Sequence, residues 1–253
     1  MPLLPGAEPY HHEGGEVGVL LCHGFTGTPQ SLRPWAEYLA EAGLTVALPR
    51  LPGHGTTWRE MARTRWEDWY AEVEREFGEL RGKCVDIFIM GLSLGGCMAL
   101  RLAERHGDSI RGVVVVNPSL RPDSPLFKVA MLMKFLVPSI PGVAGDIKKE
   151  GVAELAYERV PVKAAATLPK LWSITAAELG KITQPVLVFH SPDDHVVKPE
   201  SVAILRTALP AATIRECPDS YHVATLDNDA PAIFEGSLEF IREHASVPLK
   251  RDQ

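Results

Sequence analysis

The chain has 253 residues, of which 45% are hydrophobic and 23% charged, so it can bury one large core and is not a disordered chain. The formal net charge is −6, and no stripe of lysine and arginine occurs, which argues against nucleic acid as a partner. The first 16 residues lack the basic and apolar regions of a secretory signal, and no apolar run is long enough to span a membrane. The cysteines have neither metal-site nor disulfide-scaffold spacing. We therefore expect a soluble cytoplasmic protein with reduced thiols.

Short runs rich in β-branched residues recur along the chain and predict the strands of a sheet. Most are continuously apolar, which indicates strands covered on both faces, as in a parallel sheet. Thr28 is placed to cap a helix that begins at Pro29, and apolar residues recur at helical spacing from Trp66 to Leu80. The predicted strands are residues 17–22, 44–49, 84–90, 112–117, 185–190 and 213–218. This alternation predicts an α/β fold with a doubly wound, mostly parallel sheet.

One connection, residues 119–184, is far longer than a crossover between parallel strands requires, and we interpret it as an inserted cap, or lid. The predicted domains are a core of residues 1–118 and 185–253 and a cap of residues 119–184. Within the cap, residues 126–138 read LFKVAMLMKFLVP and are apolar on nearly every helical face. Two interpretations remain open for this segment: extra core packing, or a surface turned toward an apolar cavity, a membrane or a micelle.

A candidate nucleophile lies where a predicted strand meets a predicted helix. Residues 91–95 read GLSLG, directly after the strand at residues 84–90 and before an apolar helical segment. This is the context of a nucleophile elbow, a turn so sharp that the serine backbone is strained and two flanking glycines must leave room for strand and helix. Ser93 is therefore the predicted nucleophile, and Gly91 and Gly95 are the glycines that the turn requires.

A serine hydroxyl becomes a strong nucleophile when a base removes its proton and an acid orients that base. The loop at residues 190–195 reads HSPDDH after a predicted strand, and it offers Asp193 and Asp194 as alternative acids between which spacing does not choose. The base we predict is His222, because it lies between the last predicted strand and the last predicted helix, in the order Ser, Asp, His. His54 and His195 lie in loops, and we interpret both as structural.

The oxyanion of a tetrahedral intermediate needs two backbone N–H donors. In an elbow one donor is the residue after the nucleophile, here Leu94, and the other comes from the loop after an earlier strand. Residues 23–27, HGFTG, form such a loop, and we assign the second donor to Phe25, with His23 holding the loop. No dinucleotide, P-loop or zinc motif occurs in the sequence, so neither a cofactor nor a metal is expected.

Several of these segments resemble small bacterial monoacylglycerol lipases of the α/β-hydrolase fold and, more distantly, bacterial carboxylesterases. The resemblance covers nearly the whole chain, and its motifs are GAEP (6–9), HGFTGTP (23–29), LPRLPGHGT (48–56), GLSLGG (91–96), ELAYERVP (154–161), SPDDHVV (191–197) and SYHVATLDND (220–229). It implies an α/β-hydrolase sheet whose cap is inserted between strands 6 and 7 and covers an acyl tunnel. Because the family carries its acid directly before HVV, the resemblance also implies that Asp194 is the acid.

The resemblance further implies that Glu154 lies near the glycerol headgroup of the substrate. Glu154 also shares an i, i+4 row with Glu150 and Glu158, a spacing typical of a solvated helix, so a surface charge is the alternative.

The predicted function is a serine hydrolase that cleaves carboxylic esters through an acyl-enzyme, with the small lipid ester monoacylglycerol as substrate. A general carboxylesterase for short or medium chains is an alternative that shares the same triad. A second alternative, from another class, is a non-catalytic ligand receptor on a hydrolase scaffold. Dehalogenases and epoxide hydrolases of this fold are excluded, because they carry an aspartate where this chain has Ser93.

Overall fold

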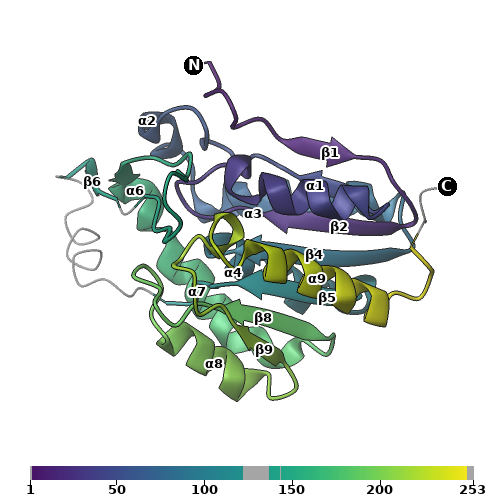
Figure 1. Ribbon diagram of the computed structural model, residues 1–253. Helices are drawn as coiled ribbons and strands as arrows, with labels where there is room; N and C mark the ends of the chain where they lie inside the picture. Colours follow the sequence, from purple (N-terminus) through teal and green to yellow (C-terminus); the bar gives the residue numbers. More distant parts are fainter. Residues whose placement is uncertain (1, 122–136, 143, 250–253) are drawn as a thin grey trace.

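The fold is built on one seven-stranded sheet in the computed structural model, which describes residues 2–121, 137–142 and 144–249 (Figure 1). The strand order is β1-β3-β2-β4-β5-β8-β9, and all neighbours run parallel except β1, which is antiparallel to β3. The strands of this sheet are β1 (Tyr10–His12), β2 (Val17–Cys22), β3 (Thr45–Leu48), β4 (Asp86–Leu92), β5 (Gly112–Val116), β8 (Val186–His190) and β9 (Thr213–Glu216). The predicted mostly parallel sheet is confirmed, and each of the six predicted strands contributes to it.

The edge strand β1 was not predicted from the sequence. Its three residues, YHH, are half-buried or exposed and lack an apolar pattern. The strand exists because its backbone pairs with the backbone of β3, with Tyr10 opposite Leu48 and His12 opposite Val46. A strand held by backbone pairing at a sheet edge leaves little signal in side-chain hydropathy.

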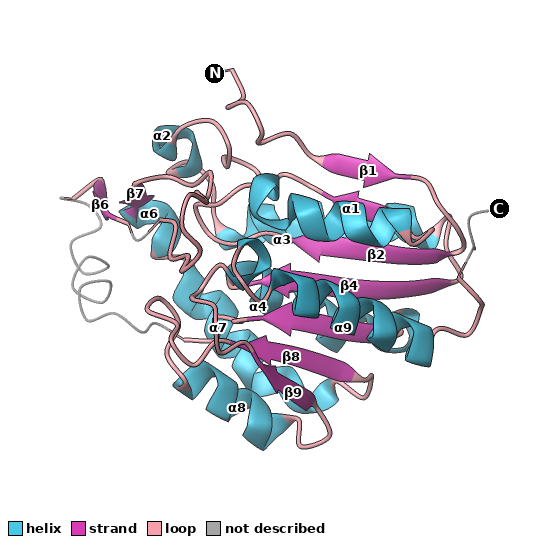
Figure 2. Ribbon diagram, in the orientation of Figure 1, coloured by secondary structure: helices cyan, strands magenta, loops and turns pink. Residues whose placement is uncertain are grey.

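Helices cover both faces of the sheet, as a doubly wound fold requires (Figure 2). Helices α1 and α9 pack on one face, where Trp35 and Ile233 are fully buried. Helices α3, α4 and α7 pack on the other, where Trp69 and Leu171 are fully buried. The α-helices that the structure describes are α1 (Arg33–Glu41), α2 (Trp58–Met61), α3 (Trp66–Arg81), α4 (Leu94–His106), α6 (Val162–Ala165), α7 (Leu168–Glu178), α8 (Glu200–Ala208) and α9 (Ala230–His244). The described 3-10 turns are η1 (Pro29–Leu32), η2 (Gly107–Ser109), η3 (Leu179–Lys181) and η4 (Ala224–Leu226).

The helix predicted to begin at Pro29 has two parts. Its first turn is η1, in which the side chain of Thr28 accepts a hydrogen bond from the Gln30 N–H, as the sequence predicted for a cap. The α-helix α1 then continues to Glu41.

No helix among the described residues is long and apolar enough to cross a membrane.

The predicted cap, residues 119–184, is inserted between β5 and β8, which are the fifth and sixth strands of this sheet in chain order and not the sixth and seventh as expected. Its described part holds a small antiparallel hairpin of β6 (Ser139–Pro141) and β7 (Arg159–Pro161), followed by α6. Helix α7, at the end of the insertion, packs into the same apolar cluster as the sheet. The division at residues 119 and 184 stays a prediction. The apolar segment 126–138 lies almost wholly outside the described residues.

The register of the central strands brings their carboxyl ends to one edge. Cys22 of β2 lies opposite Gly91 of β4, and Val116 of β5 lies opposite both Leu92 and Phe189. Loops that are far apart in the sequence therefore meet at this edge, where open α/β sheets place their binding sites.

Candidate active site

Ser93 lies at the turn between β4 and α4 and has the strained backbone of an elbow, with φ 57° and ψ −118°. A Cβ atom on Gly91 would lie 2.3 Å from the carbonyl carbon of Gly95, and one on Gly95 would lie 1.8 Å from the carbonyl oxygen of Cys22. Both contacts are with backbone and are too short for any side chain, so strand and helix approach this closely only with glycine at both positions. The N–H of Ser93 donates to the Val116 carbonyl at 3.0 Å, which ties the turn to the neighbouring strand.

The loop after β2 passes beside Ser93, as predicted for an oxyanion loop. A Cβ atom built on Gly24 would lie 3.6 Å from the Cβ of Ser93. Leu94 is the first residue of α4, so its N–H is one of those that a helix leaves without an intrahelical acceptor. The ring of Phe25 packs on Trp69, at 5.5 Å between ring centroids. The two predicted oxyanion donors, Phe25 and Leu94, line the same cavity as Ser93.

His23 holds the oxyanion loop through both nitrogens of its ring. Its Nε2 accepts from the N–H of Leu51 at 3.1 Å, so its Nδ1 carries the proton and donates to the Gly24 carbonyl at 3.0 Å. Burial lowers the pKa of His23 to about 4, and the ring is therefore neutral at physiological pH. A neutral ring with both nitrogens bonded fits the structural role that the sequence predicted for His23.

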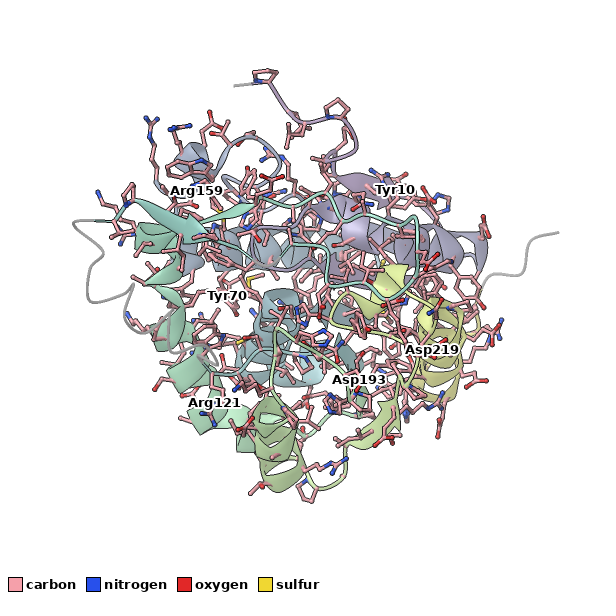
Figure 3. All side chains as sticks on the ribbon, turned by 60° about the vertical axis from the view of Figure 1, so that its left-hand side comes forward. Tyr10, Tyr70, Arg121, Arg159, Asp193 and Asp219 are labelled. Carbon is pink, nitrogen blue, oxygen red and sulfur yellow. The ribbon has the colours of Figure 1, made fainter. Side chains whose placement is uncertain are left out.

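The loop after β8 presents one of its two aspartates to His222. Oδ2 of Asp194 accepts from Nδ1 of His222 at 2.7 Å, and both side chains are buried. Oδ1 of Asp194 accepts from the backbone N–H groups of Val196 and Val197, each at 2.8 Å, which fixes the carboxylate in place. Asp193 is exposed, and Figure 3 labels it on the loop that leads to α8. The geometry therefore favours Asp194, the residue that the family resemblance implied.

Several charged groups act on His222. Burial by itself lowers the pKa of the ring, but the charge of Asp194 and its hydrogen bond raise it, and the charges of Glu154 and Asp146 raise it further. The net result is a pKa above the ordinary value for histidine. Because Nδ1 donates to Asp194, Nε2 of the neutral ring is an acceptor, which is the state required of a general base.

Asn117 connects the loop after β8 that carries Asp194, here called the acid loop, with the loop after β9 that carries His222, here called the base loop. Sequence reasoning missed this residue. It follows β5 with a positive φ of 43°, a conformation that asparagine tolerates better than most residues. Its Nδ2 donates to the Ser191 hydroxyl at 3.0 Å and to the His222 carbonyl at 2.9 Å, while its Oδ1 accepts from the Ser191 N–H at 2.8 Å. The only sequence signal is an asparagine that ends the apolar run GVVVV, which is also typical of an ordinary turn.

One cavity of about 330 Å³ joins these groups, and Ser93, His222 and Leu94 all line it. Part of its wall is apolar, formed by Ile140, Val160, Leu168 and Trp172 of the inserted segment and by Val196 and Val197 of the loop after β8. Beyond the triad, the polar residues that line the cavity are Thr26, Ser119, Arg121, Asp146, Glu154 and His195. The cavity thus combines an apolar wall with a few polar groups, the usual composition of a site for a small organic ligand.

Glu154 lies in this cavity and not on a solvated helix, because residues 150–158 are not helical. The alternative based on the spacing of three glutamates is therefore wrong. Oε2 of Glu154 accepts from the Gly145 N–H at 3.1 Å, and Oε1 lies 2.9 Å from the place that a Cβ on Gly27 would take. Burial raises the pKa of Glu154, although this hydrogen bond and His222 partly offset the effect.

Comparison with protein families agrees with this geometry. The model of a family described as the alpha/beta hydrolase family matches residues 19–235. The chain belongs to this family. Its match includes the elbow and the loops that carry Asp194 and His222.

Individual relatives are lipases and esterases. The chain is 46% identical to a thermostable monoacylglycerol lipase of Bacillus sp. (strain H-257), over 96% of this chain and 98% of the relative. It is 26% identical to a carboxylesterase of Bacillus subtilis (strain 168), over 93% of this chain and 96% of the relative. A solved structure described with the metagenome-derived lipolytic enzymes LipS and LipT superimposes with a TM-score of 0.93 at 40% identity, covering 96% of this chain and all of the other.

Proposed function

We propose that this protein is a serine hydrolase that cleaves monoacylglycerol to glycerol and a fatty acid. The observation that carries the proposal is the set of Ser93, the buried pair of His222 and Asp194, and the N-terminus of α4 around one partly apolar cavity. The 46% identity to a monoacylglycerol lipase over nearly the full length of both chains supports the choice of substrate.

In the proposed mechanism, Oγ of Ser93 attacks the ester carbonyl carbon while Nε2 of His222 takes the hydroxyl proton. The N–H groups of Phe25 and Leu94 donate to the oxyanion that forms. Collapse breaks the ester C–O bond, and His222 gives its proton to the departing glycerol oxygen. Water then attacks the acyl-enzyme with His222 again as base, which releases the fatty acid and restores Ser93. Asp194 keeps the ring in the required tautomer and stabilises its charged form.

The two ends of the cavity suit the two ends of a monoacylglycerol. The apolar wall that includes Leu168 and Trp172 suits the acyl chain, and Glu154 can accept hydrogen bonds from the glycerol hydroxyls. A general carboxylesterase is the second candidate, because the carboxylesterase of Bacillus subtilis matches over nearly the whole chain. The two candidates share the triad and differ in whether the headgroup is recognised.

Two measurements test the proposal. A fluorophosphonate probe should label wild-type protein stoichiometrically at Ser93, and Ser93→Ala should remove both the adduct and nearly all ester hydrolysis while the protein stays folded. An unlabelled wild type would favour the non-catalytic receptor instead. Rates on mono-, di- and triacylglycerols and alkyl esters of matched chain length then separate the two enzymes. Equal rates on monoacylglycerol and triacylglycerol would contradict the proposed substrate, because a second and third acyl chain should not fit this cavity.

A further inference from the structure

The strap, which we define as residues 144–157, lies between strands β6 and β7 and is fastened to the core at several points. The amide of Gln30 brackets Glu154, because its Nε2 donates to the Ala153 carbonyl at 3.1 Å and its Oε1 accepts from the Leu155 N–H at 2.9 Å. At the other end of the strap, the carboxylate of Asp227 accepts from the backbone N–H groups of Lys148 and Lys149, at 2.7 and 2.8 Å.

One residue of the strap, Asp146, contacts both the acid loop and the base loop. Its Oδ2 accepts from the N–H of His222 at 3.1 Å and from the N–H of His195, which directly follows Asp194, at 3.2 Å. Its Oδ1 accepts from Nδ1 of the His195 ring at 2.8 Å, and its backbone carbonyl accepts from the Val223 N–H at 3.1 Å. The side chain of Asp146 is only 11% exposed and His222 is buried, so loss of the carboxylate would leave the His222 N–H without its partner, whereas His195 is exposed to solvent.

We propose that Asp146 is a positioning residue for the triad. From its place on the strap, Asp146 sets the distance between the acid loop and the base loop. The inference rests on the proposed function, since it concerns the alignment of Asp194 and His222 as an acid–base pair. Asn117, at the end of β5, joins the same two loops through Ser191 and the His222 carbonyl. The base loop is thus held from two sides, by Asn117 through its carbonyl and by Asp146 through its N–H. A shift of about 1 Å in a catalytic group is enough to slow a reaction by about a hundredfold.

Asp146 also contributes charge, and this gives the proposal a second readout. The charged groups that raise the pKa of His222 are Asp194, Glu154 and Asp146. Arg121 lines the same cavity, as does His195, the titratable group paired with Asp146. Each of the three carboxylates favours the protonated form of His222. Loss of the Asp146 charge alone should therefore lower the pKa of His222. The acid limb of the kcat/KM profile, where activity rises as His222 loses its proton, should then move to lower pH.

The test compares Asp146→Ala with Asp146→Asn. Asparagine keeps a side-chain oxygen that can accept from the two backbone N–H groups but has no charge, whereas alanine keeps neither. We expect Asp146→Ala to lower kcat, and the rate of fluorophosphonate inactivation, by about tenfold to a hundredfold. We expect Asp146→Asn to stay within about threefold of wild type on the alkaline plateau, less than 1 kcal/mol, with its acid limb displaced to lower pH. The fluorophosphonate is small and needs no headgroup contact, so its rate reports on the triad and not on substrate binding by the strap.

Two control variants isolate the effect. Asp193→Asn removes an exposed negative charge from the acid loop and should leave kcat and the acid limb unchanged, because solvent and salt screen it. Gln30→Ala removes another attachment of the strap, at Ala153 and Leu155, and should lower Tm with a smaller effect on inactivation than Asp146→Ala.

The outcomes separate the inference from the proposed function. If the probe does not label wild type, the proposed function fails. If wild type is labelled and folded Asp146→Ala reacts within twofold of it, the positioning role is refuted. Equal losses in Asp146→Ala and Gln30→Ala, or a change in KM alone, would also refute it in favour of general support of the strap. Should Asp146→Ala not fold, Asp146→Ser takes its place, because its short side chain cannot reach both loops, and inactivation within twofold of wild type would then refute the positioning role.

Discussion

Glu154 should determine whether this protein prefers monoacylglycerol to a simple ester. Its Oε2 already accepts from the Gly145 N–H, and Oε1 lies next to Gly27 in the cavity that contains Ser93. A carboxylate offers about four lone-pair sites, so most of its accepting capacity remains for the two free hydroxyls of a bound monoacylglycerol. An aryl or alkyl ester has no hydroxyl to donate.

The expected magnitude follows from that difference. A hydrogen bond to a charged group contributes about 1.5 to 3 kcal/mol, which corresponds to about tenfold to a hundredfold in kcat/KM. Glu154→Ala should therefore lower kcat/KM on monoacylglycerol by this factor and leave a p-nitrophenyl ester of equal chain length nearly unchanged. Glu154→Gln should have a smaller effect, because its amide oxygen still accepts a neutral hydrogen bond of about 0.5 to 1.5 kcal/mol.

The assay must be done on the alkaline plateau, because the charge of Glu154 raises the pKa of His222 and its loss would otherwise alter both substrates. Glu150→Gln and Glu158→Gln are matched controls, since both glutamates flank Glu154 and are exposed. If both substrates lose rate together in Glu154→Ala, the residue supports the strap and does not bind the headgroup. If neither substrate is hydrolysed more slowly, the result supports the carboxylesterase interpretation.

Three further predictions concern the loops of the triad. Asp194→Asn should lower kcat by about a thousandfold or more, because it favours the wrong tautomer of His222, while Asp193→Asn should remain active; the reverse order in an esterase assay would move the acid by one residue. The raised pKa of His222 means that the ring loses its proton at higher pH than usual, so the midpoint of the acid limb of kcat/KM should lie above about 6.5; a midpoint well below that value would contradict the electrostatic argument. Asn117→Ala leaves several buried partners unpaired, at about 1 to 3 kcal/mol each, and should lower Tm in calorimetry far more than the exposed control Asn228→Ala does; equal Tm values would show that Asn117 does not hold the loops.

The features that could be predicted from the amino-acid sequence are those that local chemistry dictates. The glycines around Ser93 could be assigned because a sharp turn between strand and helix leaves no room for a side chain, and the structure places backbone atoms there. Five largely apolar runs predicted strands because burial on both faces demands them, whereas the sixth, at residues 213–218, forms the exposed edge strand β9. The Thr28 cap could be predicted because it depends on atoms within the same turn.

Contacts between groups that are distant in the sequence could not be predicted, because they depend on how the loops fold against one another. Asp193 and Asp194 are chemically identical neighbours, and the direction of each side chain depends on how the loop after β8 closes against His222. Asp146 and Asn117 carry no local signature, since their hydrogen bonds reach loops about 50 to 100 residues away. The place of Glu154 was likewise ambiguous, because i, i+4 spacing has meaning only in a helix, and this segment is extended over the core by its attachment to Gln30. Local sequence patterns indicate the backbone conformation that a residue adopts. The partner of a buried polar group depends instead on the register of the sheet and the path of the loops.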